Sequence, residues 1–192
     1  MDQAAVLQKI RDERSPLLRQ LTMVGLVGFL LEQQGKPMPV LIGGAALSYY
    51  SREVYFTSDI DLAYSDHQAL DLVLTDLGFR RAGRYWIHQE LDIAVEAPAG
   101  CLSGENAPRE IVELEGGLRC EILGLEDLVI DRLNAYKYWE SQIDGEMTEL
   151  LIRRYSAEMD WNYLEQKAGL PENDTRKELQ ALRERISCEP GR

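Results

Sequence analysis

The sequence is poor in the residues that build disulfide frameworks, zinc sites and membrane spans. Its 192 residues include three cysteines and two histidines. Cys101, Cys120 and Cys188 form no C-x-x-C pair, which excludes a disulfide scaffold or zinc-ligand set made from them and favours a reducing compartment. The most apolar run, Leu21 to Leu31, is shorter than the roughly 20 residues of a bilayer span. We therefore expect a cytoplasmic protein with no membrane partner.

Positive charge is also scarce. The chain has 21 Lys and Arg against 33 Asp and Glu, for a formal net charge of −12. A protein that coats nucleic acid neutralises phosphates with surplus basic side chains, so this balance argues against such a role, although a local basic patch stays open. With 45% hydrophobic and 28% charged residues the composition is that of a folded globular chain.

Hydrophobic periodicity predicts alternating helices and strands in the first part of the chain. Leucines and valines recur at helical spacing up to Gln34, with a break at Ser15-Pro16 where the proline ring ends one helix. The expected elements that follow are a buried strand at 40–42 closed by Gly43-Gly44, a helix at 45–51, a strand at 60–64, and a Ser65-capped helix ending at Gly78. The pattern predicts a β-α-β-α unit.

The rest of the chain divides into a strand-rich part and a helical part. Short strands are expected at 79–82, 85–88 and 91–95, a loop at 96–109, and a hairpin of 110–114 with 118–122 around Glu115-Gly116-Gly117. Beyond Gly124 helical patterns continue to about residue 187, with breaks expected near Gly145, around Ser156 and at 169–171. We predict a mixed α/β domain at 1–123, including the N-terminal helices, and a helical region at 124–192 packed on it.

Two carboxylates stand out on the second predicted strand. In Asp59-Ile60-Asp61-Leu62 both acids project from one face, while Ile60 and Leu62 project from the other into the core. Adjacent like charges cost energy unless a cation lies between them, and hard oxygen ligands suit Mg²⁺. An edge strand with a solvated polar face is an equally weighted alternative for this motif alone.

Two further segments extend the pattern. In the strand around Asp92, the side chains of Leu91, Ile93 and Val95 would be buried, so that Asp92, Ala94 and Glu96 share the other face and a third acid could meet the first two. Upstream, Gly43-Gly44 joins a strand to a helix start, where free N–H groups can hold a phosphate.

This combination of Gly43-Gly44, Asp59, Asp61 and Asp92 resembles the nucleotidyltransferase superfamily of the DNA polymerase beta type. The resemblance spans roughly residues 38 to 96, and a finer one, which includes Arg52 and Ser58, points to the minimal bacterial branch with AbiEii-type and MenA-type toxins. It implies that Asp59, Asp61 and Asp92 are catalytic and bind Mg²⁺ or Mn²⁺. It also implies that Gly43, Gly44, Arg52 and Ser58 lie at the nucleotide phosphates.

Arg132 is a candidate from the helical region. The segment around it resembles a helix of that branch, which usually carries Lys where this chain has Arg132. Arg132 falls on an apolar stripe with Leu125, Leu128, Val129 and Leu133, so it should point toward the catalytic domain and bind phosphate. The alternative is a structural pair with an acid such as Glu121 or Glu126.

A basic cluster in the strand-rich part also has two interpretations. Arg80, Arg81 and Arg84 precede Tyr85 and Trp86. Together they could form a stacking and phosphate platform for a nucleotide or an RNA end. The structural alternative is a twisted hairpin with solvated arginines.

The sequence thus predicts a metal-dependent nucleotidyltransferase that moves a nucleoside monophosphate from a nucleoside triphosphate to an acceptor. A tRNA, a protein hydroxyl and a small molecule stay open as the acceptor. Binding to a protein partner or to a second copy of the chain, and membership of a toxin-antitoxin pair, stay open as well. The alternative is a catalytically silent, antitoxin-like binding or regulatory module. Three acids kept close together argue against that alternative.

Overall fold

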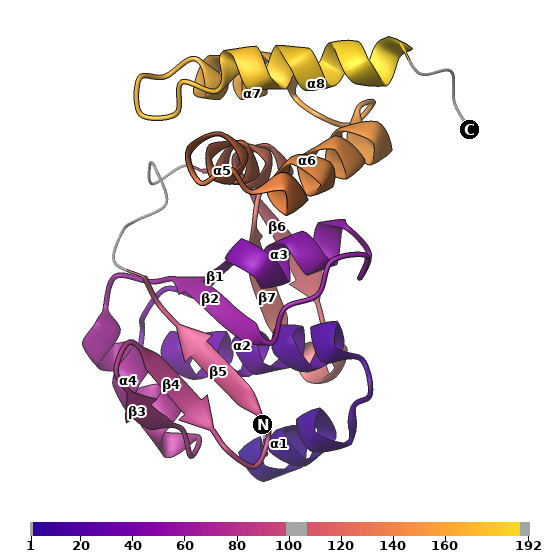
Figure 1. The fold of residues 1–192 in the computed structure, drawn as a ribbon. Coiled ribbons are helices and arrows are strands. Elements are labelled where there is room, and N and C mark those ends of the chain that lie inside the picture. Colours follow the sequence, from indigo (N-terminus) through magenta and orange to yellow (C-terminus); the bar gives the residue numbers. More distant parts are fainter. Residues whose placement is uncertain (1, 99–106, 189–192) are drawn as a thin grey trace. The chain divides into compact units, whose positions relative to one another are not determined.

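The computed structural model describes residues 2–98 and 107–188 (Figure 1). Part of the loop expected at 96–109, with Cys101, lies outside these residues. The chain divides into two compact units, one ending at Leu123 and the other starting at Gly124. None of the described helices is both long and apolar enough to cross a bilayer.

The first unit is built on a seven-stranded mixed sheet in the order β3-β4-β5-β2-β1-β7-β6. Strand β2 pairs in parallel with β5, and β1 in parallel with β7, while the remaining neighbours are antiparallel. The predicted mixed α/β class is confirmed. The strands are β1 (Val40–Ile42), β2 (Asp59–Ala63), β3 (Arg80–Ala82), β4 (Tyr85–His88), β5 (Ile93–Glu96), β6 (Arg109–Glu113) and β7 (Arg119–Leu123), and the helices are α1 (Gln3–Asp12), α2 (Pro16–Gln33), α3 (Gly43–Tyr50) and α4 (His67–Asp76).

Local capping sets the helix boundaries. The predicted break at Ser15-Pro16 is confirmed: Pro16 opens α2, and the Ser15 hydroxyl accepts the Leu18 N–H at 3.1 Å. Helix α4 is capped by Asp66, which accepts the Ala69 N–H at 3.0 Å, and not by Ser65 as expected. The acid one residue further on is the side chain that can reach the free N–H groups of the first turn.

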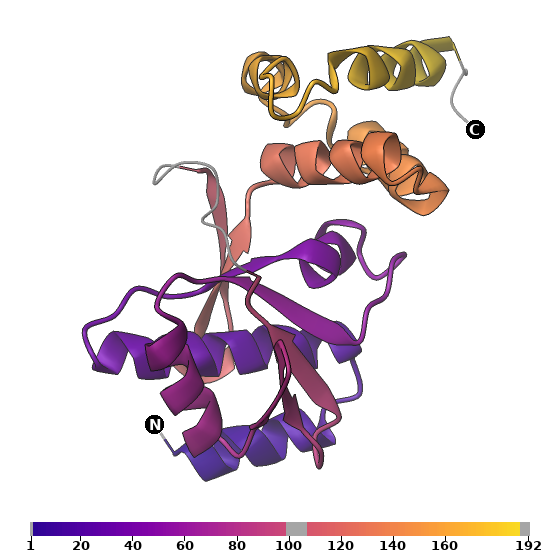
Figure 2. The same ribbon diagram turned by 60° about the vertical axis from the view of Figure 1, so that its left-hand side comes forward.

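The sheet has one buried and one more open face. Along β2 and β5 buried and partly exposed side chains alternate, so Ile60, Leu62, Ile93 and Val95 belong to the core. Helix α2 crosses close to β7, because a Cβ on Gly25 would lie only 3.1 Å from the Arg119 carbonyl oxygen. Strand β5 passes in front of α2 in Figure 1, and α1 lies beside α2 in both ribbon views (Figures 1 and 2). The partly exposed side chains of β2 therefore lie on the face opposite the core.

The second unit consists of helices, as the sequence predicts. The turn after α6 falls at Ser156 and the next after α7 at Gly169, both near expected breaks, but the break expected near Gly145 is wrong. Gly145 lies inside α6, where a Cβ would be 2.6 Å from the Tyr136 ring, so the glycine serves close helix packing. The helices are α5 (Leu125–Tyr138), α6 (Gln142–Tyr155), α7 (Trp161–Ala168) and α8 (Arg176–Cys188).

Candidate active site

The turn from β1 into α3 lies directly against Asp61. Gly43 has φ +63°, and a Cβ there would be 2.2 Å from the Asp61 Oδ2. Only glycine satisfies both the left-handed backbone and this close approach. Next to it, a Cβ on Gly44 would be 3.0 Å from the Thr57 side chain. The Gly43-Gly44 turn and the acid-bearing strand, which the sequence singled out separately, are therefore in contact.

Asp59 is held by groups that the sequence analysis missed. The Thr57 hydroxyl donates a hydrogen bond to Asp59 Oδ1. The buried Gln20 side chain of α2 donates from its Nε2 to the Thr57 carbonyl at 2.9 Å and to the Asp59 carbonyl at 3.4 Å. Gln20 thus fixes the backbone on both sides of Ser58. A polar residue directly before the apolar run that starts at Leu21 was the available signal.

A row of side chains runs across the open face of the sheet at Asp61. Asp61 is paired in register with Ile42 on one side and Glu96 on the other, and Glu96 is paired with Tyr85. Side chains in register on adjacent strands share a face and lie close together. Glu96 is therefore the acid beside Asp61, and its side chain is 13% exposed.

Asp92 has a different place from the one its alternation predicts. Strand β5 begins at Ile93, and Asp92 precedes it with φ +51° in a turn where its N–H donates to the Gln89 carbonyl. The residue in register with Asp59 is Ala94, which follows Asp92 by two residues. Asp92 is exposed and lies outside the paired part of the strand. The structure brings Glu96, and not Asp92, next to Asp61.

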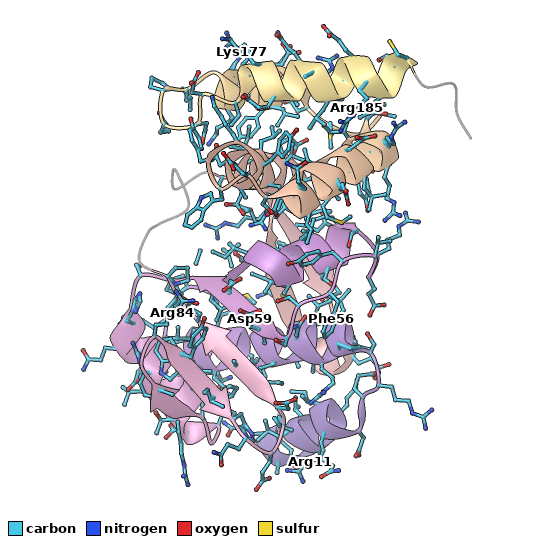
Figure 3. All side chains as sticks on the ribbon, viewed as in Figure 1. Arg11, Phe56, Asp59, Arg84, Lys177 and Arg185 are labelled. Atoms are coloured by element: carbon cyan, nitrogen blue, oxygen red, sulfur yellow. The ribbon has the colours of Figure 1, made fainter. Side chains whose placement is uncertain are left out.

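Arg84, in the β3–β4 turn, is bound to this row. Its Nε lies 3.3 Å from Glu96 Oε2, and its Nη2 donates to the Tyr85 hydroxyl at 2.5 Å. The hydrogen bond to Tyr85 and the charges of Glu96 and Asp61 raise the pKa of Arg84. Figure 3 labels Arg84 and Asp59. A guanidinium group therefore lies at the acidic part of the site.

The other arginines of the basic cluster do not share this position. Arg81 stacks on Trp86 with its Cζ 3.9 Å from the ring centroid, and the indole N–H donates to Asp71 at 2.7 Å. Trp86 is 1% exposed. A buried ring already covered by an arginine is not a free stacking platform, so the hairpin interpretation holds for Arg81 and Trp86.

Asp59 and Asp61 fit a divalent cation only in part. Among residues 2–98 and 107–188, no three His, Cys, Asp or Glu side chains gather closely enough to hold a metal ion. Mg²⁺, however, commonly takes one or two protein carboxylates and completes its shell with water and substrate phosphates. Because Gly43 has no Cβ, the Asp61 carboxylate packs directly against the backbone of the turn. The pair therefore suits Mg²⁺ or Mn²⁺ bound together with a ligand that supplies further oxygens.

Arg52 and Ser58 lie near these elements along the chain. Arg52 follows α3 in an exposed turn with φ +53°, and its N–H donates to the Tyr49 carbonyl at 3.1 Å. Ser58 is exposed between Thr57 and Asp59. Both side chains are open to solvent.

Arg132 is engaged inside the helical unit. Its Nη1 lies 2.8 Å from Asp144 Oδ1, and its Nη2 pairs with Asp131. Burial alone would lower the pKa of Arg132, yet the charges and hydrogen bonds of both aspartates hold it above the ordinary value. The acids proposed as structural partners have other contacts: Glu121 pairs with Arg109, and Glu126 accepts the Asp160 N–H. The partners of Arg132 are thus aspartates that the sequence analysis did not name.

Replacing Gln20 with Leu should destabilise the protein by about 1–3 kcal/mol, because the Thr57 and Asp59 carbonyls lose a buried donor. Gln33→Leu, on the exposed end of the same helix, is the matched control and should stay within about 0.5 kcal/mol of wild type. Urea unfolding of both variants measures the difference. Equal stabilities would remove Gln20 from its supporting role.

Comparison with known proteins gives structural likeness only. No protein-family model matches the chain, and no curated protein matches it in sequence. The solution structure of the antibiotic-resistance factor ANT(2'')-Ia has a TM-score of 0.53 at 15% identity, over 88% of this chain and 98% of that one. The crystal structure of ANT(2'')-Ia in complex with adenylyl-2''-tobramycin gives 0.51 at 16% identity, over 86% and 98%.

A third solved structure is similar to the chain to the same degree. An antigenic nucleotidyltransferase-like protein from Paracoccidioides brasiliensis has a TM-score of 0.53 at 16% identity, over 88% of this chain and 93% of that one. Likeness at such low identity establishes the fold and leaves the activity to the site residues. The mixed sheet with its C-terminal helices is a nucleotidyltransferase-like fold.

Proposed function

We propose that the protein is a metal-dependent nucleotidyltransferase, which moves a nucleoside monophosphate from a nucleoside triphosphate to an acceptor hydroxyl and releases pyrophosphate. One observation carries the proposal. The Gly43 turn lies against the Asp61 carboxylate, with Asp59 on the same face of the same strand. Nucleotidyl transfer depends mainly on positioning and on neutralising charge at phosphorus, and this arrangement can provide both.

In this proposal one group of residues binds the metal ion and another binds the nucleotide phosphates. Asp59 and Asp61 would hold Mg²⁺ or Mn²⁺, which supplies charge neutralisation at the phosphates when bound. Gly43 and Gly44 start α3, where backbone N–H groups lack helical acceptors and can donate to phosphate oxygens. Ser58 and Arg52 would add side-chain donors. A phosphate role for Arg132 would require breaking its pairs with Asp131 and Asp144, and we assign it a structural role instead.

We assign the part expected of Asp92 to Glu96, because Glu96 is the cross-strand neighbour of Asp61. The acceptor oxygen would attack the α-phosphorus, forming one P–O bond while the bond to the bridging oxygen of pyrophosphate breaks. The hydroxyl proton would pass to the Glu96 carboxylate. A carboxylate acting as general base must lie within hydrogen-bond reach of that hydroxyl, which the open face of the sheet permits.

A small molecule is the acceptor class we favour. The solved complex of ANT(2'')-Ia holds an adenylylated small molecule, adenylyl-2''-tobramycin. A net charge of −12 disfavours a polyanionic acceptor such as tRNA. The finer resemblance to AbiEii-type and MenA-type toxins, and with it a toxin-antitoxin role, stays a prediction.

Mg²⁺ or Mn²⁺ with a nucleoside triphosphate should raise the melting temperature, because a ligand that binds only the folded state stabilises it by mass action. At a ligand concentration 100 times Kd the gain is about 2.7 kcal/mol, or roughly 5 to 10 °C for a chain of this size. Differential scanning fluorimetry with each of the four common ribonucleoside triphosphates, with metal and with chelator, measures it.

Asp59→Asn is the matched variant for this measurement. It should remove the metal-dependent part of the shift and leave the melting temperature in chelator near that of wild type. If no combination of metal and nucleotide shifts wild type at millimolar concentration, the enzyme hypothesis is wrong and the silent binding module becomes the better account.

A further inference from the structure

Arg84 pairs with Glu96, the acid in register with Asp61. Its ion pair with Glu96 is at 3.3 Å, and its side chain is 69% exposed while that of Glu96 is 13% exposed. The arginine thus reaches from the β3–β4 turn over the open face of the sheet, and most of it stays in solvent. The pair is exposed on its arginine side only, so solvent screens the guanidinium while the Glu96 carboxylate is mostly buried.

Side chains of the first unit's sheet fix the position of the Arg84 guanidinium. Tyr85, Glu96 and Asp61 follow one another in register across β4, β5 and β2. Arg84 donates to the Tyr85 hydroxyl, and its Cζ lies 4.8 Å from the centroid of that ring. Tyr85 therefore holds the guanidinium by a hydrogen bond and by cation–π contact at the end of the row.

We propose that Arg84 neutralises Glu96 and the neighbouring Asp61 in the metal-free protein, that a divalent metal held by Asp59 and Asp61 repels it from this position, and that the freed guanidinium then binds a phosphate of the nucleoside triphosphate. The inference rests on the proposed function and adds an order of events to it. Glu96 cannot take the proton of the acceptor hydroxyl while it is paired with Arg84, whereas the guanidinium fork matches phosphate oxygens as well as carboxylate oxygens.

The proposal predicts opposite changes in two affinities when Arg84 is replaced by Gln. Mn²⁺ alone should bind about two- to fivefold more tightly, because a positive charge beside Asp61 is gone. ATP in the presence of Mn²⁺ should bind roughly tenfold more weakly, because a charge-assisted contact to phosphate is lost. The full chain is titrated with Mn²⁺ by electron paramagnetic resonance of the free ion and with ATP by calorimetry.

Arg81→Gln is the matched control. It removes the same charge from the same hairpin, but Arg81 stacks on Trp86 and lies 3.7 Å from Asp71. Both affinities should stay within twofold of wild type. Arg84→Lys keeps the charge without the planar fork, so its Mn²⁺ affinity should match wild type while its ATP affinity falls in part.

The outcomes separate this inference from the proposed function. If Asp61→Asn abolishes Mn²⁺-dependent ATP binding while Arg84→Gln leaves both affinities unchanged, the displacement is wrong and the nucleotide site stands. If Arg84→Gln and Arg81→Gln change the Mn²⁺ and ATP affinities equally, the effect comes from the net charge of the hairpin, and the proposal is wrong. If wild type binds neither Mn²⁺ nor ATP, both proposals fall.

Discussion

Asp61→Asn should lower the rate of nucleotidyl transfer about a hundredfold or more, because the amide cannot hold a divalent cation at the phosphates and metal ions contribute several kcal/mol to such reactions. Glu96→Gln should cause a loss of similar size, because no carboxylate is then left to take the proton from the acceptor hydroxyl. Pyrophosphate release with a panel of small hydroxylated acceptors measures both.

Asp92→Asn is the control that tests the assignment. Asp92 is exposed in the turn before β5, so its variant should keep wild-type turnover and wild-type metal-dependent stabilisation. Melting in chelator checks that all three variants fold. If Asp92→Asn lost activity while Glu96→Gln kept it, the third acid would be Asp92, and the turn would have to rearrange when substrate binds.

Arg132→Met should destabilise the protein by about 3 kcal/mol, which corresponds to a fall of roughly 6 to 12 °C in melting temperature. Methionine keeps most of the apolar length, so the loss comes from Asp144, whose side chain is only 15% exposed and would lose its partner. Nucleotide affinity, normalised to folded protein, should not change. Thermal melting and calorimetry on one sample give both values.

Lys177→Met provides the surface control, since Lys177 is exposed on α8 and its loss should move the melting temperature by no more than a degree or two. The double variant Arg132→Met with Asp144→Leu should recover much of the stability, because the orphaned charge is removed with its partner. A tenfold loss of nucleotide affinity in Arg132→Met at unchanged stability would restore the phosphate role.

Local chemistry made much of the first unit predictable. Pro16 after Ser15 fixes a helix start, and the glycines of the β6–β7 hairpin adopt φ +78° and +76° as the predicted turn requires. Alternation placed Ile60 in the core and the acids beside it on the other face. Each of these features depends on neighbours within a few residues, which the sequence displays directly.

The rest depends on which strands and helices meet. The alternation from Asp92 to Glu96 offered two acids on one face, and only the pairing of β5 with β2 selects Glu96 as the neighbour of Asp61. Gln20 reaches Thr57 across 37 positions of sequence. The burial of Arg132 was predictable from its helical stripe, but its partner Asp144 comes from the next helix. Strand register and helix crossing are decided by tertiary packing, and a short stretch of sequence does not show which elements pack together.

The two edges of the open sheet have a consequence for behaviour in concentrated solution. Edge strand β3 has the sequence Arg80-Arg81-Ala82 and is exposed at all three residues, and the opposite edge, β6, begins with Arg109-Glu110 and ends with Glu113. Unpaired backbone groups on an edge strand invite another chain to add a strand, and edge charges oppose this. Both edges are thus protected against aggregation by sheet extension, while the uncharged β1 is enclosed between β2 and β7.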